Sequence, residues 1–238
     1  MKRKRQAAQG SLEYALILLL IAVAAIITMQ IMGISVQSVY CRVAGGLGVS
    51  NCAASAICQD DFNNISNELL KYGTWQFTNG QICNINNNYT GGMLYNKCSM
   101  NGSLSTSDYT ASLNGADLAS GNGYGIMFRT SDTGSGLNGY AFQYDPGLGG
   151  FVMRKWVNGA EITPPLAQKS YSGYNWYAQT HNLSVKVVGN TFTGYVDGQV
   201  VLTGTDPNNT YPSGGTAIRT WDSTNVCIDQ FTLNSNTP

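Results

Sequence analysis

The feature that most constrains this chain is a series of short apolar segments, separated by turn residues, that fills its C-terminal half. The clearest segments are residues 123–129, 140–144, 151–157, 183–188, 191–196 and 199–202. Each is rich in aromatic and β-branched residues, which favour strands. The pairs Asn158–Gly159 and Asp197–Gly198 lie between segments, and such residues accept the positive φ that tight hairpins require. Strands at intervals of about 8–12 residues with turns of this kind predict an antiparallel sandwich or jelly roll.

The distribution of charge argues against one class of partner. The chain contains 13 Lys and Arg and 13 Asp and Glu, so its formal net charge is zero. Four of the cations lie together at residues 2–5, so the rest of the chain is mildly acidic. Phosphate binding requires a basic face. We therefore expect no nucleic acid partner.

The N-terminal segment contains the most specific local signal. The basic tetrad at residues 2–5 precedes an apolar run from Ala15 to Ile27, which continues with two polar interruptions to Gly33. About twenty apolar residues in a helix can span a bilayer, and cations before them predict that this end stays cytoplasmic. A secretory signal peptide would place small residues at a cleavage site after the run. A plain membrane anchor would not explain Glu13, because a carboxylate beside an apolar segment is costly unless it is paired.

The sequence QGSLEYALILLLIAVAAI resembles the type IVb pilins of the Flp/Tad group. Precursors in that family have a short basic leader, cleavage just before the apolar segment, and Glu-Tyr at mature positions five and six. Matching this pair to Glu13 and Tyr14 implies cleavage between Ala8 and Gln9. The family usually has Gly before the cut, so cleavage after Gly10 stays open. Archaeal type IV-like pilins share a Gln-x-Ser-x-Glu pattern, which Gln9, Ser11 and Glu13 also match. The bacterial or archaeal source therefore stays open as well.

The pilin resemblance implies a mechanism of assembly. Cleavage would create a cationic α-amino group on Gln9, and Glu13 of a neighbouring subunit would neutralise it in the filament core. Gln9, Glu13 and Tyr14 are therefore the expected assembly residues. The precursor would be inserted in the cytoplasmic membrane, and the mature subunit would be extracellular in a cell-surface pilus. The implied partners are copies of the chain in a helical filament, a prepilin peptidase and the inner-membrane pilus assembly machinery.

A second resemblance covers about residues 58–234. The ordered segments Gly-Tyr-Gly-Ile-Met-Phe-Arg (123–129), Gly-Tyr-Ala-Phe-Gln-Tyr-Asp-Pro-Gly (139–147) and Ile-Arg-Thr-Trp-Asp-Ser (218–223) look like the concanavalin A-like, or laminin G-like, jelly roll. Together the two resemblances imply an α+β chain in four parts. These are a cleaved basic leader (1–8), a hydrophobic polymerisation or transmembrane helix (9–43), a Gly/Ala-rich linker (44–57) and a concanavalin A-like antiparallel β-sandwich (58–238).

All six cysteines follow the apolar run, and an even number in an exported region indicates a disulfide framework. They are Cys41, Cys52, Cys58, Cys83, Cys98 and Cys227. A zinc site is disfavoured because no CxxC occurs and the single histidine, His181, is far from every cysteine in sequence. We expect no metal and no cofactor.

The pairing of the cysteines stays open at this level. The candidate pairs are Cys41 with Cys52 across the linker, Cys58 with Cys227, and Cys83 with Cys98 across a hairpin. The first has the alternative that one of its members reaches into the β domain. The second is implied by the jelly-roll resemblance, in which the first and last strands lie together. Six cysteines allow fifteen connectivities.

The β domain contains few residues suited to catalysis. Glycoside hydrolysis usually needs two carboxylates across one cleft. Glutamate occurs only at Glu13, Glu68 and Glu161, and most aspartates lie in turn contexts, where they bond to the local backbone. No Ser/His/Asp order or phosphate-binding loop stands out. We expect that the chain is not an enzyme.

The residues of this domain are better suited to glycan binding than to catalysis. Aromatic faces offer stacking surfaces to sugars, while Arg, Asp and Tyr hydrogen-bond hydroxyl groups. The candidates are Trp156, Trp221, Asp222, Arg129, Arg154 and Tyr140, and the competing role for each tryptophan is core packing. The sequence thus predicts a pilus subunit that displays its sandwich for adhesion and for binding surface glycans. The alternative is a membrane-anchored carbohydrate-binding or carbohydrate-processing surface protein that does not polymerise.

Overall fold

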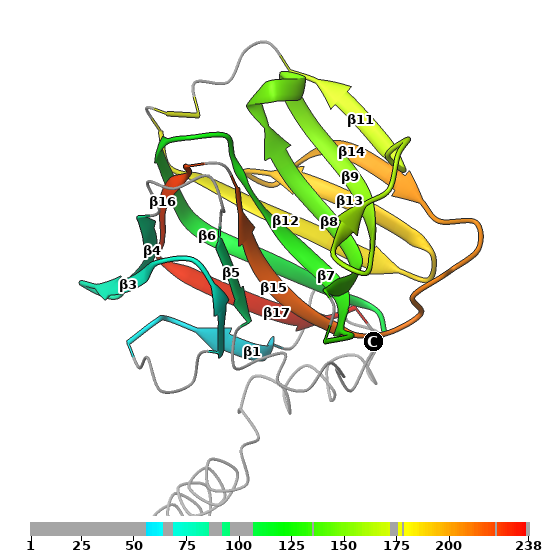
Figure 1. Ribbon diagram of the computed structural model, residues 1–238, viewed down its shortest axis with the longest axis horizontal. Helices are drawn as coiled ribbons and strands as arrows, with labels where there is room; N and C mark the ends of the chain where they lie inside the picture. The colour runs from blue at the N-terminus through cyan, green and yellow to red at the C-terminus, as the bar shows by residue number, and fades with distance from the viewer. Residues whose placement is uncertain are drawn as a thin grey trace, which may run out of the picture. The chain divides into compact units, whose positions relative to one another are not determined.

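Two antiparallel β-sheets, one lying over the other, form the part of the chain that the structure describes (Figure 1). The computed structural model describes residues 56–63, 69–85, 92–95, 107–134, 136–171, 176–177, 179–221 and 223–236. All of them belong to one compact unit, Ala56–Pro238.

The larger sheet has nine strands. Its main path runs β14 (Gln199–Thr205), β13 (Thr191–Val196), β12 (His181–Val188), β6 (Tyr109–Ser120), β16 (Asn225–Ile228), β4 (Gln81–Ile85) and β3 (Trp75–Thr78). The remaining two strands are β17 (Gln230–Ser235), which also pairs with β6, and β1 (Ala56–Asp60), which pairs with β17. The first and last described strands therefore lie side by side, as the jelly-roll resemblance implies.

The second sheet has eight strands. Its path runs β10 (Ala160–Glu161), β9 (Gly150–Val157), β8 (Leu137–Asp145), β7 (Tyr124–Asp132), β15 (Gly215–Thr220), β5 (Gly92–Tyr95) and β2 (Leu69–Tyr72), and β11 (Ala167–Ser170) also pairs with β9. A short 3-10 turn, η3 (Pro146–Leu148), joins β8 to β9. In Figure 1 the strands β7, β8 and β9 cross over β12 and β13 of the larger sheet.

The core fills the space between the two sheets. In β12 the buried residues Leu183, Val185 and Val187 alternate with more exposed ones, which confirms the one-sided pattern read from the sequence. The rings of the opposite sheet pack against this face. A Cβ atom added to Gly194 would lie 2.4 Å from the ring of Phe142. Glycine at this position therefore lets β13 approach the second sheet closely.

The predicted turn residues have the backbone that tight hairpins require. Asn158 and Asp197 have φ of 51° and 48°, and the glycine after each also has positive φ. Asp and Asn tolerate this left-handed region better than most residues, and glycine adopts it without strain. The turns expected between β9 and β10 and between β13 and β14 are thus confirmed.

The expected α+β class is wrong for the described chain, which is an all-β sandwich. Its helical content there is the three-residue turn Pro146–Leu148. No helix among the described residues is long and apolar enough to cross a membrane. The long helix expected at residues 9–43 lies outside the described residues, as do the leader, Ala8, Gln9, Glu13 and Tyr14. The error has a physical source: the class was assigned from a single apolar run, whereas every packed element that the structure describes is a strand.

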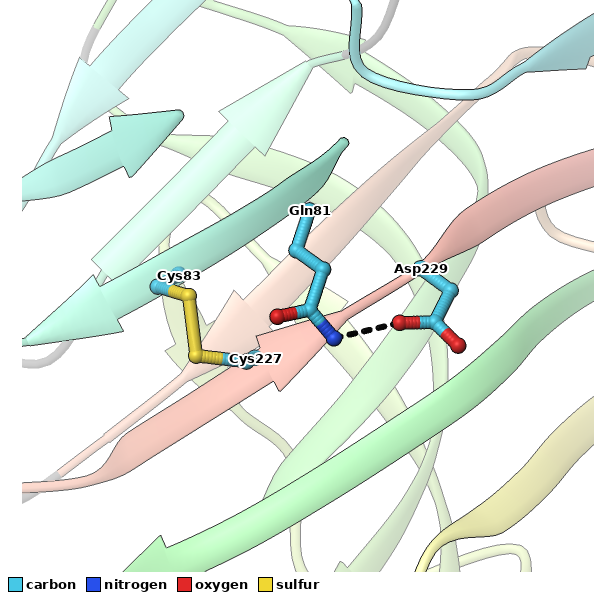
Figure 2. The surroundings of a disulfide bond; sticks show 4 residues. All are labelled: Gln81, Cys83, Cys227 and Asp229. Atoms are coloured by element: carbon cyan, nitrogen blue, oxygen red, sulfur yellow. Dashed lines mark hydrogen bonds between the residues drawn. A yellow bond between two sulfur atoms is a disulfide. The ribbon is translucent and has the colours of Figure 1, made fainter. Parts of the chain in front are cut away.

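One disulfide of the described domain joins Cys83 to Cys227 (Figure 2). The two residues are opposite each other in the register of β4 and β16, and their Cα atoms are 4.0 Å apart. Beside them the Gln81 amide donates to the Asp229 carboxylate, with 2.5 Å between Nε2 and Oδ1. The bond thus links strands whose cysteines are 144 residues apart in sequence.

This bond corrects two of the predicted pairs, Cys58–Cys227 and Cys83–Cys98. The C-terminal segment forms two strands, and β1 pairs with the second of them, so Cys58 lies opposite Leu233 rather than beside Cys227. Cys58 is also disulfide-bonded. The remaining candidates, Cys41, Cys52 and Cys98, lie outside the described residues.

Candidate functional site

The face of the eight-stranded sheet that points away from the core has a small apolar cluster of its own. Side chains alternate between the two faces of a strand. Ile126 and Ile218 belong to the main core, and Met127 and Ala217, their neighbours on β7 and β15, belong to a separate small cluster with Ala141. Longer aromatic and polar side chains beside this cluster contact one another.

Arg219 on β15 is the centre of this group. Its guanidinium carbon lies 4.4 Å from the ring centroid of Trp156 and 4.6 Å from that of Trp221, so the cation contacts two indole faces. Its Nη1 donates to Gln143 Oε1 at 2.8 Å, and its Nη2 lies 3.2 Å from Glu161 Oε1. Arg219 therefore links residues from β8, β9 and β10 to its own strand.

A second arginine extends the network. Arg154 Nε lies 3.2 Å from Glu161 Oε2, and Arg154 Nη2 lies 3.9 Å from Asp145 Oδ2. The other Asp145 oxygen accepts a hydrogen bond from the Leu148 backbone N–H, which orients this carboxylate at the start of η3. Glu161 thus contacts both guanidinium groups, one through each oxygen. We refer to Gln143, Asp145, Arg154, Trp156, Glu161, Arg219 and Trp221 as the Arg219 site.

Strand register explains how these side chains meet. Gly125 on β7 lies opposite Gln143 on one side and opposite Arg219 on the other. A Cβ atom at Gly125 would come within 2.6 Å of Gln143 Cβ and of the Phe142 carbonyl oxygen. Glycine therefore leaves the space through which Arg219 reaches across β7 to Gln143.

The side chains of the Arg219 site are mostly buried but keep partial contact with solvent. The side chains of Arg154 and Arg219 are each 11% exposed, whereas that of Glu161 is 29% exposed and Trp221 is half-buried. The indole nitrogen of Trp156 is buried and makes no hydrogen bond to the described chain. The site thus offers hydrogen-bond donors, acceptors and an apolar ring together.

The structure brings together three of the six candidates predicted from sequence, namely Trp156, Trp221 and Arg154. It does not place Arg129 or Tyr140 with them. Both are buried, at 1% and 0% exposure. Asp222 lies outside the described residues.

Arg129 and Tyr140 hold the segment that follows β14. The Arg129 guanidinium donates to the backbone carbonyls of Ser107 and Tyr211 and to the Asn209 side chain. Burial raises the pKa of Tyr140, whose hydroxyl donates to Asp206 Oδ2 at 2.8 Å. Both side chains therefore hold the framework together, and neither lies in the Arg219 site.

Asp206 is the acceptor around which this segment folds. Burial acts to raise its pKa, but hydrogen bonds from Thr210, Tyr140 and the backbone N–H of Asn208 outweigh it and lower the pKa to about 2. Lys155 Nζ also lies 3.6 Å from Asp206 Oδ2. The carboxylate is therefore ionised and fully engaged at neutral pH.

Sequence reasoning missed four residues of the site: Gln143, Asp145, Glu161 and Arg219. Asp145 does lie at a turn, the context expected for most aspartates of the domain, but its second oxygen faces Arg154. A usable signal existed for Arg219, because it lies near the end of β15 and two positions before Trp221, which directly follows that strand. Glu161 had no such signal, since its partners Arg154 and Arg219 come from other strands.

Comparisons with known proteins reveal the fold. No protein-family model and no curated protein matches the chain. Among solved structures, the carbohydrate binding module CBM66 from Bacillus subtilis is similar with a TM-score of 0.57 and 21% identity, over 71% of this chain and 96% of that one. The exoplasmic/lumenal domain of VIP36, bound to Ca²⁺ and Man3GlcNAc, has a TM-score of 0.57 and 10% identity, over 78% and 91%. A Bacillus licheniformis β-glucanase has a TM-score of 0.51 and 12% identity, over 75% and 98%.

The described domain is thus a galectin- or concanavalin-like jelly-roll sandwich, and this part of the predicted resemblance is confirmed. The similarities show the fold alone, because proteins of this architecture include both binding modules and a glucanase. Function must therefore be argued from the Arg219 site.

Proposed function

We propose that the domain Ala56–Pro238 is a carbohydrate-binding module and that the Arg219 site is where it holds a sugar. The observation that carries this proposal is the Arg219 guanidinium, which lies between two tryptophan rings while it contacts Gln143 and Glu161. Such a site combines fixed polar groups with apolar ring surface, as sites for small polar ligands do.

The chemistry of a sugar matches this combination. Each hydroxyl both donates and accepts hydrogen bonds, so it can bridge a guanidinium and a carboxylate. The C–H face of a sugar ring can lie against an indole, and Trp221 is half-buried rather than enclosed. Of the similar structures, one is a carbohydrate binding module and another has Man3GlcNAc bound.

We further propose that the domain binds without catalysing a reaction. Glu161 contacts an arginine through each of its oxygens, and Asp145 divides its oxygens between Arg154 and a backbone N–H. Neither carboxylate is arranged as a proton donor or as a nucleophile toward a bound sugar. The disulfides at Cys83–Cys227 and Cys58 support a location outside the cytoplasm, where such bonds persist.

The filament-subunit role stays a prediction, because it rests on residues outside the described part. Mass spectrometry of protein sheared from the cell surface tests it directly. A mature N-terminus at Gln9 is expected, and an intact basic tetrad at residues 2–5 would contradict it. This result is independent of sugar binding by Ala56–Pro238.

Sugar binding is tested with a glycan array followed by calorimetry on the full chain and on Trp221→Ala. We expect the variant to lose at least tenfold in affinity, since a stacked aromatic contact contributes roughly 0.5–1.5 kcal/mol beyond the apolar area it buries. Tyr195→Ala is the matched control, because Tyr195 is a half-buried aromatic residue on β13 of the other sheet. Equal affinity of both variants and the unaltered protein would refute the assignment of the site.

A further inference from the structure

We propose that the Arg219 site selects uncharged sugars and rejects sugars that carry a carboxylate or sulfate group. This inference rests on the proposed sugar binding and concerns the class of sugar. It begins from the charges that the described residues place in the site, which are two guanidinium groups and two carboxylates. The cations of the site are therefore balanced by its own acids.

Both arginines are already occupied by an anion of the protein. Glu161 lies 3.2 Å from Arg154 through Oε2 and 3.2 Å from Arg219 through Oε1. This is the arrangement that an acidic sugar would need for its own carboxylate. Such a ligand would have to displace Glu161 or lie beside it, and like charges in close contact disfavour binding.

The rest of the site keeps the arginines in these pairings. Arg219 is fixed between Trp156 and Trp221 and by its bond to Gln143, so it cannot turn toward a new anion without losing these contacts. Arg154 is 11% exposed and is shared with Asp145. A free carboxylate would therefore meet cations whose positions are set by internal partners.

The hydroxyl groups of a neutral sugar can hydrogen-bond to Glu161 and Arg219 without breaking the ion pair between them. A carboxylate oxygen accepts more than one hydrogen bond, and a guanidinium has five N–H groups. A hydroxyl placed beside the Glu161–Arg219 pair can donate to the first residue and accept from the second. The site thus matches groups that donate and accept at once, which an ionised acid does not.

The experiment compares neutral oligosaccharides with their counterparts whose terminal sugar is a uronic acid, by array and calorimetry on the full chain. We expect at least tenfold tighter binding of the neutral member of each pair. Glu161→Gln frees both guanidinium groups from their shared anion, and we expect this variant to reduce or reverse the preference by at least tenfold. Asp132→Asn is the control, because it changes the net charge equally at an exposed residue at the end of β7.

The inference would be overturned if the unaltered protein preferred the uronic acid. It would also be overturned if Glu161→Gln kept the same preference for the neutral sugar. Either result leaves the proposed sugar binding intact. Absence of binding to any sugar would instead remove the proposed function and this inference together.

If Glu161→Gln does not fold, the salt dependence of sugar binding by the unaltered protein tests the inference. Raising the salt from about 0.01 M to about 1 M shortens the screening length from about 30 Å to about 3 Å. Binding of the uronic acid should tighten relative to the neutral sugar as its repulsion from Glu161 is screened, and a relative weakening of the uronic acid by tenfold would contradict the inference.

Discussion

Replacing Arg129 with methionine tests whether this arginine belongs to the framework or to the binding surface. The residue is 1% exposed, and its guanidinium donates to Ser107 O at 3.0 Å, to Tyr211 O at 3.2 Å and to Asn209 Oδ1 at 3.2 Å. Methionine keeps much of the apolar stem but makes none of these bonds. It therefore leaves two backbone carbonyls without this donor.

The size of the effect follows from these contacts. Hydrogen bonds to charged groups contribute roughly 1.5–3 kcal/mol each, so three of them set an upper range of about 4.5–9 kcal/mol. The variant no longer has to bury a guanidinium, which offsets part of this loss, and burial does lower the pKa of Arg129. We therefore expect the free energy of unfolding to fall by about 3–5 kcal/mol.

Thermal and denaturant unfolding of the full chain measure this loss. For a domain of this size about 1 kcal/mol shifts the Tm by roughly 2–4 °C, so a decrease of about 6–20 °C is expected. Lys186→Met on the outward face of β12 is the control and should stay within about 0.5 kcal/mol of the unaltered protein. A loss below about 1 kcal/mol for Arg129→Met would refute the framework role. Weaker sugar binding by the folded fraction of Arg129→Met would also refute the framework role.

Two further predictions concern acid stability and the disulfide. The pKa of Asp206 in the folded chain, about 2, lies below the ordinary aspartate value of 3.8. The contribution of Asp206 to stability is therefore present above about pH 4 and is lost as the pH falls toward 2. Asp206→Asn should lower the free energy of unfolding at pH 7 by roughly 2 kcal/mol and should remove most of this loss of stability in acid. Denaturant titrations at pH 2 and pH 7 measure both effects. If the variant were less stable than the unaltered protein by the same amount at both pH values, the role given to Asp206 would be contradicted. Replacing Cys83 and Cys227 by serine should cost roughly 2–5 kcal/mol. Non-reducing peptide mapping should show these two cysteines joined to each other, and a link from Cys227 to Cys58 would disprove the pairing.

The sequence predicted the local structure of the β domain well, because strands and turns depend on neighbouring residues. The alternation in residues 183–188 and the positive φ at Asn158 and Asp197 needed no long-range information. The two-layer sandwich followed from the same pattern. The α+β class failed for the described chain because it extended one apolar run to the architecture of the whole.

Half of the predicted glycan candidates lie together in the structure. The strand face on which a residue lies explains why Trp156 and Arg154 are among them and Tyr140 is not. Trp156 and Arg154 are two positions apart on β9 and share the outward face. Tyr140 lies on β8, where its neighbour Ala141 belongs to the outward cluster and its own ring joins the core. Residue type alone cannot separate these cases, because aromatic residues suit both a core and a sugar site.

What the sequence determined by itself was thus a chain of strands and turns in which aromatic residues and arginines are available on alternate faces. Only the tertiary structure decided that Glu161 meets Arg219, and that Cys227 bonds Cys83 rather than Cys58. Such contacts depend on the order and register of strands far apart in the chain. These are set by the packing of the whole sandwich, and no local propensity encodes them.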